Sequence, residues 1–139
     1  MWMYNNQIFN LDHDELSKWV GFVYLITEND TNMKYIGKKL FWSTRKLPPL
    51  KGKKRKRTVV SESDWKTYYG SSEDLKLLIE NDGGDNYTRE ILHLCTGKGE
   101  MSYIEAKEQF DRDVLLRDDY HNGIISCRIN HRAVNQLKY

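Results

Sequence analysis

The chain of 139 residues is long enough for one folded domain with a modest core and too short to expect two. Its 39% hydrophobic and 30% charged residues suit a globular protein with a hydrated surface, and its longest apolar runs are too short to span a bilayer. The net charge is only +2, yet many Lys and Arg residues and no Asp or Glu lie between Lys34 and Arg57. A locally basic face on a near-neutral protein predicts a polyanionic partner. Because the N-terminus lacks the basic start and apolar stretch of a secretion signal, we expect a cytoplasmic protein.

The first half of the chain predicts a short helix and a hairpin. An Asp-rich turn at residues 11–16 is typical of a helix start. Residues 22–27 and 34–38 are rich in β-branched and aromatic side chains and flank a polar turn, so we predict two antiparallel strands. Pro48 and Pro49 exclude helix before them, and the KGKKRKR run at 51–57 should repel itself. We therefore predict a basic, exposed loop inserted at about 46–60.

The second half predicts two helices around a third strand. Residues 61–64 favour a helix start, and Ser72 is expected to cap a helix over 73–81. Residues 87–95 alternate as a strand does, and a longer helix should run from Glu100 to about Leu116. Its expected apolar face consists of Tyr103, Ala106, Phe110 and Val114. Residues 123–129 are a candidate for a short strand. The order predicts a single α/β domain with a small antiparallel three-stranded sheet flanked by helices.

The predicted hairpin carries the most informative motif. It reads Gly21-Phe22-Val23-Tyr24, then ten residues, then Tyr35-Ile36-Gly37-Lys38. This resembles the GIY-YIG nucleases, whose paired strands carry those two tripeptides about ten residues apart. Here the first tripeptide departs from Gly-Ile-Tyr but keeps its tyrosine, and the second is intact.

Further segments extend the resemblance over residues 21–122, with the basic insert as the main departure. The family places an arginine eight residues beyond the YIG glycine, as Arg45 stands here. Glu100 and Glu105 have the spacing of the E-A-L-L-L-E run on the catalytic helix of the bacterial excision-repair nuclease domain. Residues 68–72 and 87–92 look like segments of phage-type members. An asparagine near the end of the domain matches Asn122, although Tyr120-His121-Asn122 is Y-x-N rather than Y-N.

The resemblance implies a Mg²⁺- or Mn²⁺-dependent endodeoxyribonuclease. Glu105 would hold the metal, and Glu108, which is nearer the predicted apolar face, is the alternative carboxylate. Arg45 would grip the scissile phosphate through its guanidinium fork. Each residue also has a structural interpretation, Glu105 as a solvated surface glutamate and Arg45 as one more basic loop residue.

The resemblance assigns the attacking water to the tyrosines. Tyr24 or Tyr35 would orient or deprotonate it, unless both only pack the sheet. A free phenol has a pKa of about 10, so a base role requires nearby positive charge, which Lys38 is placed to supply. Asn122 would support the site.

Double-stranded DNA is the expected partner, with a homodimer on DNA as one arrangement. The resemblance is to free-standing, phage-encoded nucleases of homing or defence type, which would act in the bacterial host cytoplasm. No base-reading module is recognisable, so specificity is loose or comes from the loop, the N-terminal segment or dimerisation. Two other interpretations stay open, a catalytically inactive DNA-binding module on the same fold and an RNA-binding basic protein. The expected DNA-phosphate contacts are Lys39, Lys51, Lys53, Lys54, Arg55, Lys56 and Arg57.

Overall fold

A central five-stranded sheet in the order β2-β1-β7-β3-β4 organises the computed structural model, which describes all 139 residues. The three strands predicted from sequence form its middle and one edge, with β3 antiparallel to both β4 and β7. The sheet is larger than predicted because the N-terminal segment adds β1, parallel to β7, and β2. Their bounds are β1 Trp2–Tyr4, β2 Gln7–Ile8, β3 Gly21–Glu28, β4 Lys34–Leu40 and β7 Tyr87–Cys95.

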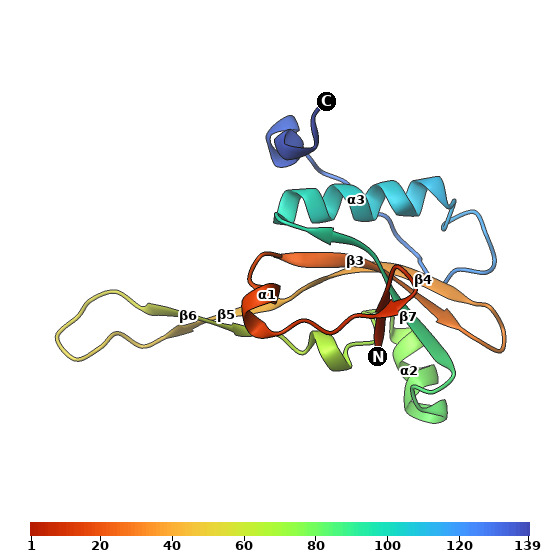
Figure 1. Ribbon diagram of the computed structural model, residues 1–139, viewed down its shortest axis with the longest axis horizontal. Coiled ribbons are helices and arrows are strands. Elements are labelled where there is room, and N and C mark those ends of the chain that lie inside the picture. The colour runs from red at the N-terminus through yellow and green to blue at the C-terminus, as the bar shows by residue number, and fades with distance from the viewer.

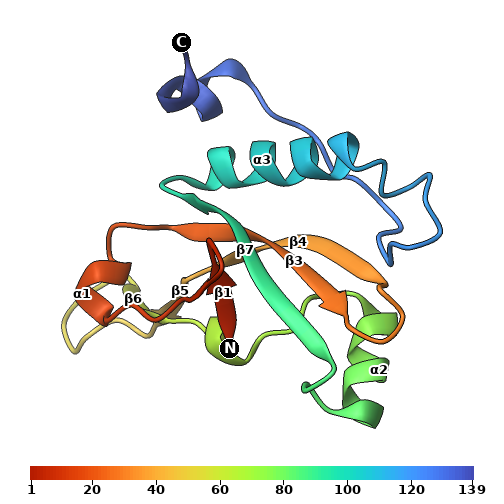
Figure 2. The same cartoon turned by 45° about the vertical axis from the view of Figure 1, so that its right-hand side comes forward.

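Helices cover both faces of this sheet. Figure 2 shows α3 across one face and α2 beneath the other. Because β3 is buried on both sides, Phe22, Tyr24 and Ile26 enter one core cluster while Val23 and Leu25 enter the second. None of the helices is long and apolar enough to cross a membrane. The helical bounds are α1 His13–Leu16, η1 Trp65–Thr67, α2 Glu73–Asp82, α3 Lys98–Asp111 and η2 His131–Leu137.

Side-chain caps begin two of the helices that the sequence predicts, and the Ser72 cap is itself predicted. Asp12 accepts a hydrogen bond from the amide of Glu15, and Ser72 accepts one from the amide of Leu75. The predicted helix start at 61–64 becomes only the 3₁₀ turn η1.

The predicted apolar face of α3 is right only in part. Ala106 and Val114 are buried as predicted. Tyr103 and Phe110 are exposed, whereas Met101 and Gln109 are buried against the sheet and Glu105 is largely buried between them. These three residues follow one another at i, i+4 and i+8, so they share a face. The helix thus turns a polar-rich face inward, which a search for apolar periodicity cannot find.

A projecting β-hairpin, here called the arm, replaces most of the predicted loop. It consists of β5, Trp42–Leu47, and β6, Arg57–Glu62, which pair antiparallel from Trp42 opposite Glu62 to Leu47 opposite Arg57. Only residues 48–56 remain as a loop. Figure 1 shows the arm extending away from the domain as a continuation of β4. Thr58, Val59 and Val60, whose types favour strands, explain why pairing extends into the segment predicted as loop.

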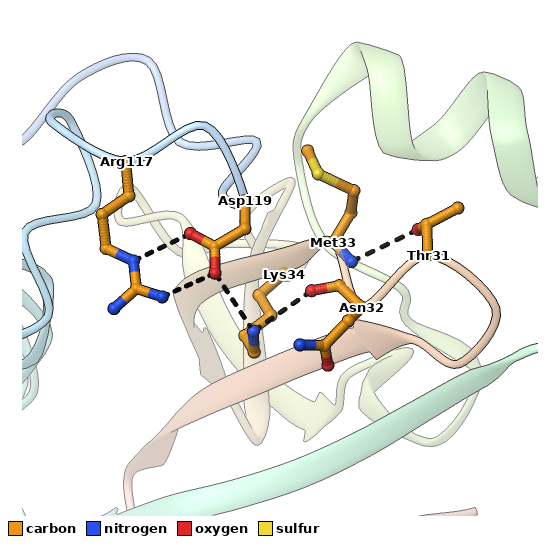
Figure 3. Close-up of polar contacts among 6 residues, drawn as sticks. All are labelled: Thr31, Asn32, Met33, Lys34, Arg117 and Asp119. Carbon is orange, nitrogen blue, oxygen red and sulfur yellow. Dashed lines mark hydrogen bonds and ion pairs between the residues drawn. The ribbon is translucent and has the colours of Figure 1, made fainter.

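The segment after α3 lies along the free edge of β4, and the strand considered over 123–129 is not formed. The amide of Lys34 donates to the carbonyl of Asp119, and the amide of His121 donates to the carbonyl of Lys34. Figure 3 shows Arg117 gripping the Asp119 carboxylate, which also faces the Lys34 ammonium at 3.5 Å. Hydrogen bonds from Arg117 lower the pKa of Asp119 to about 2, so the tie persists under mildly acidic conditions.

Candidate active site

The two motif tyrosines lie on the same face of the sheet. Tyr24 is opposite Gly37 in the β3–β4 register and Tyr35 is two residues before that glycine, so the two rings are diagonal neighbours with centroids 6.2 Å apart. Tyr24 is fully buried and its hydroxyl has no hydrogen-bond partner. Tyr35 is only partly buried, and its hydroxyl shares a 3.0 Å hydrogen bond with Ser71. Of the two, Tyr35 is therefore the one that a substrate can reach.

Gly37 connects the two tripeptides physically. A Cβ at this position would collide with the hydroxyl and ring of Tyr24, which lies across the glycine from the paired strand. The tyrosine of the first motif thus occupies the space that a side chain at the glycine of the second motif would need. Gly37 is needed here because it lets the Tyr24 ring approach the backbone of β4 closely. A left-handed backbone conformation is not the reason, since Gly37 does not adopt one.

Glu105 and Lys38 face each other on the side of β4 that α3 covers. The Glu105 side chain is 15% exposed, and one carboxylate oxygen lies 3.9 Å from the Lys38 ammonium. Lys38 also donates a 2.8 Å hydrogen bond to the hydroxyl of Ser102. Burial raises the pKa of Glu105, and the charge of Lys38 offsets this only in part.

The alternative carboxylate, Glu108, has a different environment. It accepts a 2.9 Å hydrogen bond from Arg112 one turn along α3. It lines none of the depressions described below. Its neighbours are those of a surface ion pair on a helix.

A depression of about 150 Å³ brings Tyr35, Glu105 and Asn122 together at the edge of the sheet. Because β4 is the edge strand of the sheet, Tyr35 on one face and Glu105 on the other can both line a depression at that edge. Glu105 is the depression's single carboxylate, and its oxygens accept no hydrogen bond from the protein. Such an unsatisfied oxygen ligand fits a hard divalent cation that keeps several of its waters. The remaining lining residues are Gln109, Gly123, Ile124 and Ser126.

Asn122 completes the edge of β4. Its side-chain oxygen accepts from the amide of Ile36 at 3.0 Å, and its side-chain nitrogen donates to the Ile36 carbonyl at 2.8 Å. Gln109 donates to the same carbonyl at 3.2 Å. Both amides are buried and used by the backbone, so they hold the strand between Tyr35 and Gly37 in place. Asn122 is a positioning residue, and Gln109 is a second one that the sequence did not reveal.

The tyrosines are protonated at neutral pH. Burial raises the pKa of Tyr24 well above its ordinary value, and nearby Tyr68 and Tyr35 add to the effect. Burial also raises the pKa of Tyr35, and the hydrogen bond with Ser71 opposes this only partly. The expectation that Lys38 would acidify a phenol is not met, because Lys38 is directed to Glu105 and Ser102.

Arg45 lies outside this group. It is on β5 opposite Val59, exposed, and forms no side-chain hydrogen bond or ion pair. Lys39, at the base of the arm, pairs with Asp64 at 2.6 Å and lies over the ring of Tyr68. The structure therefore assembles Tyr35, Lys38, Glu105 and Asn122 and buries Tyr24 next to them. It places Lys39 at the base of the arm and the other predicted basic residues on the arm and its 48–56 turn.

A groove of about 850 Å³ links Lys38 to the base of the arm. It runs between β4, the first turn of α3 and the two arm strands. Lysines and hydroxyls dominate its lining, which suits a phosphodiester backbone. They are Lys38, Lys39, Lys98, Ser43, Thr44, Ser61, Ser63 and Ser102. Two carboxylates also line the groove, and both are paired with lysines, Glu62 with Lys66 and Asp64 with Lys39.

His93, Cys95 and Glu100 form a separate cluster that sequence spacing did not indicate. Their potential ligand atoms lie within 4.8 Å of one another. The Glu100 carboxylate is already satisfied, by the amide and hydroxyl of Thr96, by Gln136 and by the ring of His93. Burial raises the pKa of the Cys95 thiol to about 12. This cluster therefore anchors the first turn of α3, the helix that carries Glu105.

A family model described as "Putative endonuclease segE, GIY-YIG domain" matches residues 2–125. The matched region contains the whole sheet, the arm, α3 and Asn122, and leaves out only the C-terminal segment with η2. No curated protein and no solved structure matches the chain.

Proposed function

Since the chain belongs to the GIY-YIG endonuclease family, we propose that it is a metal-dependent nuclease that hydrolyses phosphodiester bonds of double-stranded DNA. The observation that carries the proposal is the largely buried carboxylate of Glu105, which accepts no hydrogen bond and shares a depression with Tyr35. Keeping a carboxylate in such a place costs stability, as groups reserved for chemistry often do.

Mg²⁺ or Mn²⁺ is the proposed cofactor, with Glu105 as its protein ligand. When bound, such an ion neutralises charge on the phosphate and on the departing oxygen. Glu105 is preferred to Glu108 because Glu108 already pairs with Arg112 and lies away from the depression.

The chain's own residues orient the water and neutralise charge. In hydrolysis the water oxygen forms a bond to phosphorus and the bond from phosphorus to the leaving sugar oxygen breaks. The attacking water gives up a proton to the solvent and the leaving sugar oxygen takes one up, so the products are a phosphate monoester and an alcohol. A protonated Tyr35 hydroxyl, held by Ser71, would orient that water by hydrogen bonding. Lys38 would offset negative charge on Glu105 and the phosphate. Tyr24 would act indirectly, by fixing the position of Gly37 and Tyr35.

The finer biological role also belongs to this proposal. We propose a phage-type nuclease of homing or defence kind, as the sequence resemblance implies, with two copies acting together where both strands are cut. The resemblance implies that Arg45 grips the scissile phosphate, but its place on the arm, outside the depression, better suits a contact with DNA away from the cut.

Plasmid relaxation tests the proposal. Wild type, Glu105→Gln and Glu108→Gln are compared with Mg²⁺, with Mn²⁺ and with a chelator, the last variant being a matched control one turn along the same helix. Metal-dependent cutting by wild type and Glu108→Gln, lost in Glu105→Gln, is the expected result. Salt-sensitive DNA binding without cutting in any metal would instead favour the catalytically inactive binding module.

A further inference from the structure

The arm has no structural role in the domain that explains it. Its two six-residue strands pair only with each other, and side chains at 43–46 and 57–61 are exposed on both faces. A two-stranded ribbon without a core is marginally stable in water. Such an element gains stability when a partner covers it.

The charge of this region identifies the class of partner. Half of the chain's 22 Lys and Arg residues lie between Lys34 and Arg57, and no Asp or Glu is among them. Most of these cations are on the arm and its 48–56 turn. A strand ribbon with this charge is complementary to a nucleic-acid backbone.

The two faces of the ribbon differ. In the observed register Arg45 lies opposite Val59, and Leu47 lies opposite Arg57, so these four side chains share one face. The two arginines are diagonal neighbours about 7 Å apart, or about two base-pair steps. The Arg57 side chain donates to the Pro48 carbonyl only through Nε, which leaves the ends of its fork free. Arginine forks read guanine edges, and apolar side chains contact thymine methyls.

We propose that the arm lies as a β-ribbon in the major groove of duplex DNA, with Arg45 and Arg57 on base edges and the lysines of the turn on phosphates. The inference rests on the proposed nuclease function and adds the element that reads the substrate. In undistorted B-DNA the major groove, about 12 Å wide, admits a two-stranded ribbon, whereas the minor groove, about 6 Å wide, admits one only after it is widened.

The length of the strands fixes where the contacts fall. Arg45 is eight residues beyond Gly37 along a nearly continuous strand, so it reaches at most about 26 Å from the cleavage site. This distance corresponds to about eight base pairs. The turn reaches further, and the groove between Lys38 and Thr44 provides the path for the backbone between the two regions. Arg57 lies opposite Leu47, two residues further along the arm, so base contacts should lie to one side of the cut, within about ten base pairs.

Methylation interference tests this arrangement. Plasmid cut sites are first mapped by sequencing, and a duplex carrying the most frequent site is bound by the full-length Glu105→Gln protein, which leaves the DNA uncut. Methylation at guanine N7, in the major groove, should weaken binding at positions on one side of the cut. Methylation at adenine N3, in the minor groove, should not. Arg45→Ala and Arg57→Ala should each remove interference at one position and weaken binding roughly tenfold.

Lys107→Ala is the matched control, since it removes one exposed charge on the outer side of α3 without touching the arm or the groove. It should keep the wild-type interference pattern. If wild type cuts DNA but only adenine N3 interferes, or single-stranded DNA binds as tightly as duplex, the major-groove inference is overturned. The same holds if both arginine variants match Lys107→Ala. If wild type neither binds nor cuts DNA, the proposed function itself fails.

Discussion

The depression around Glu105 and the arm are joined by one continuous stretch of chain, β4 into β5, yet their physical settings are opposite. At the depression, buried amides and aromatic rings fix a few side chains, and burial shifts their pKa values. On the arm, charges are exposed, unpaired and numerous. The rate of cleavage, which needs side chains held in fixed positions, should therefore depend on the depression. The affinity for DNA, which depends on counterion release, should depend on the arm.

If the depression alone carries out the chemistry, Glu105→Gln should have the largest effect on cleavage. We expect the rate to fall roughly a thousandfold, because the several kcal/mol that a bound metal supplies are lost, while DNA binding stays within about twofold. Single-turnover cleavage and fluorescence anisotropy measure the two quantities. A parallel loss of binding would show that the two regions are not separable.

The same substitution should raise thermal stability at neutral pH. The pKa of Glu105 is higher in the folded than in the unfolded chain, so its ionised form destabilises the fold. Removing that charge should raise the Tm by a few degrees at pH 7. The gain should shrink as the pH falls below the unfolded pKa of about 4.3, where the carboxyl is protonated in both states.

On the arm, replacing Lys53, Lys54, Arg55 and Lys56 together by Ala should weaken DNA binding roughly a hundredfold at physiological salt. The slope of log affinity against log salt should decrease by up to about four, because each phosphate contact releases about one counterion. Binding titrations at several salt concentrations measure both.

A matched control neutralises four exposed lysines away from the arm. Equal losses in the two variants would mean that only net charge matters, and that the arm has no special role. The control lysines are Lys18, Lys76, Lys107 and Lys138.

Within the depression's framework, Gly37→Ala should destabilise the protein by about 1–3 kcal/mol, because the new methyl collides with the Tyr24 phenol. Urea unfolding measures the loss. Gly123→Ala, where an added Cβ meets no neighbouring atom, is the matched control. Combining Gly37→Ala with Tyr24→Phe should cost less than the two changes summed, since the nearest clashing atom, the hydroxyl, is gone and only ring carbons remain in the way. Strict additivity would contradict the proposed contact.

The smallest expected effect is a shift in pH dependence. Lys38→Met removes the charge that partly offsets burial of Glu105, so the pKa of Glu105 should rise further. Since cleavage requires the carboxylate, the acidic limb of the pH–rate profile should move to higher pH, by less than about one unit. Lys107→Met, a control on the same helix as Glu105, should leave the acidic limb of the profile in place. An unshifted limb in Lys38→Met would mean that another group controls it.

Elements whose signals are local could be predicted from the sequence. Residue types and alternation predicted β3, β4 and β7. The Asp-rich turn predicted α1, the Ser72 cap predicted α2, and the two tripeptides indicated the family that the match over residues 2–125 confirms. Pairing of Tyr24 with Gly37 follows directly once those strands align, because side chains alternate with period two.

Other features depend on contacts with segments far away in the chain, so only the folded structure reveals them. β1 pairs with a strand more than 80 residues away in the sequence, and its own three residues are too few to show a strand pattern. Glu105 and Gln109 face inward although they are polar, since they serve the edge of β4, and periodicity registers only apolar residues. Asn122 acquires its role only where the chain returns to Ile36. The basic run became the end of a ribbon because the strand pairing of β5 and β6 extends into the segment predicted as loop. Sequence patterns record local preferences, and these features arise from contacts between distant segments.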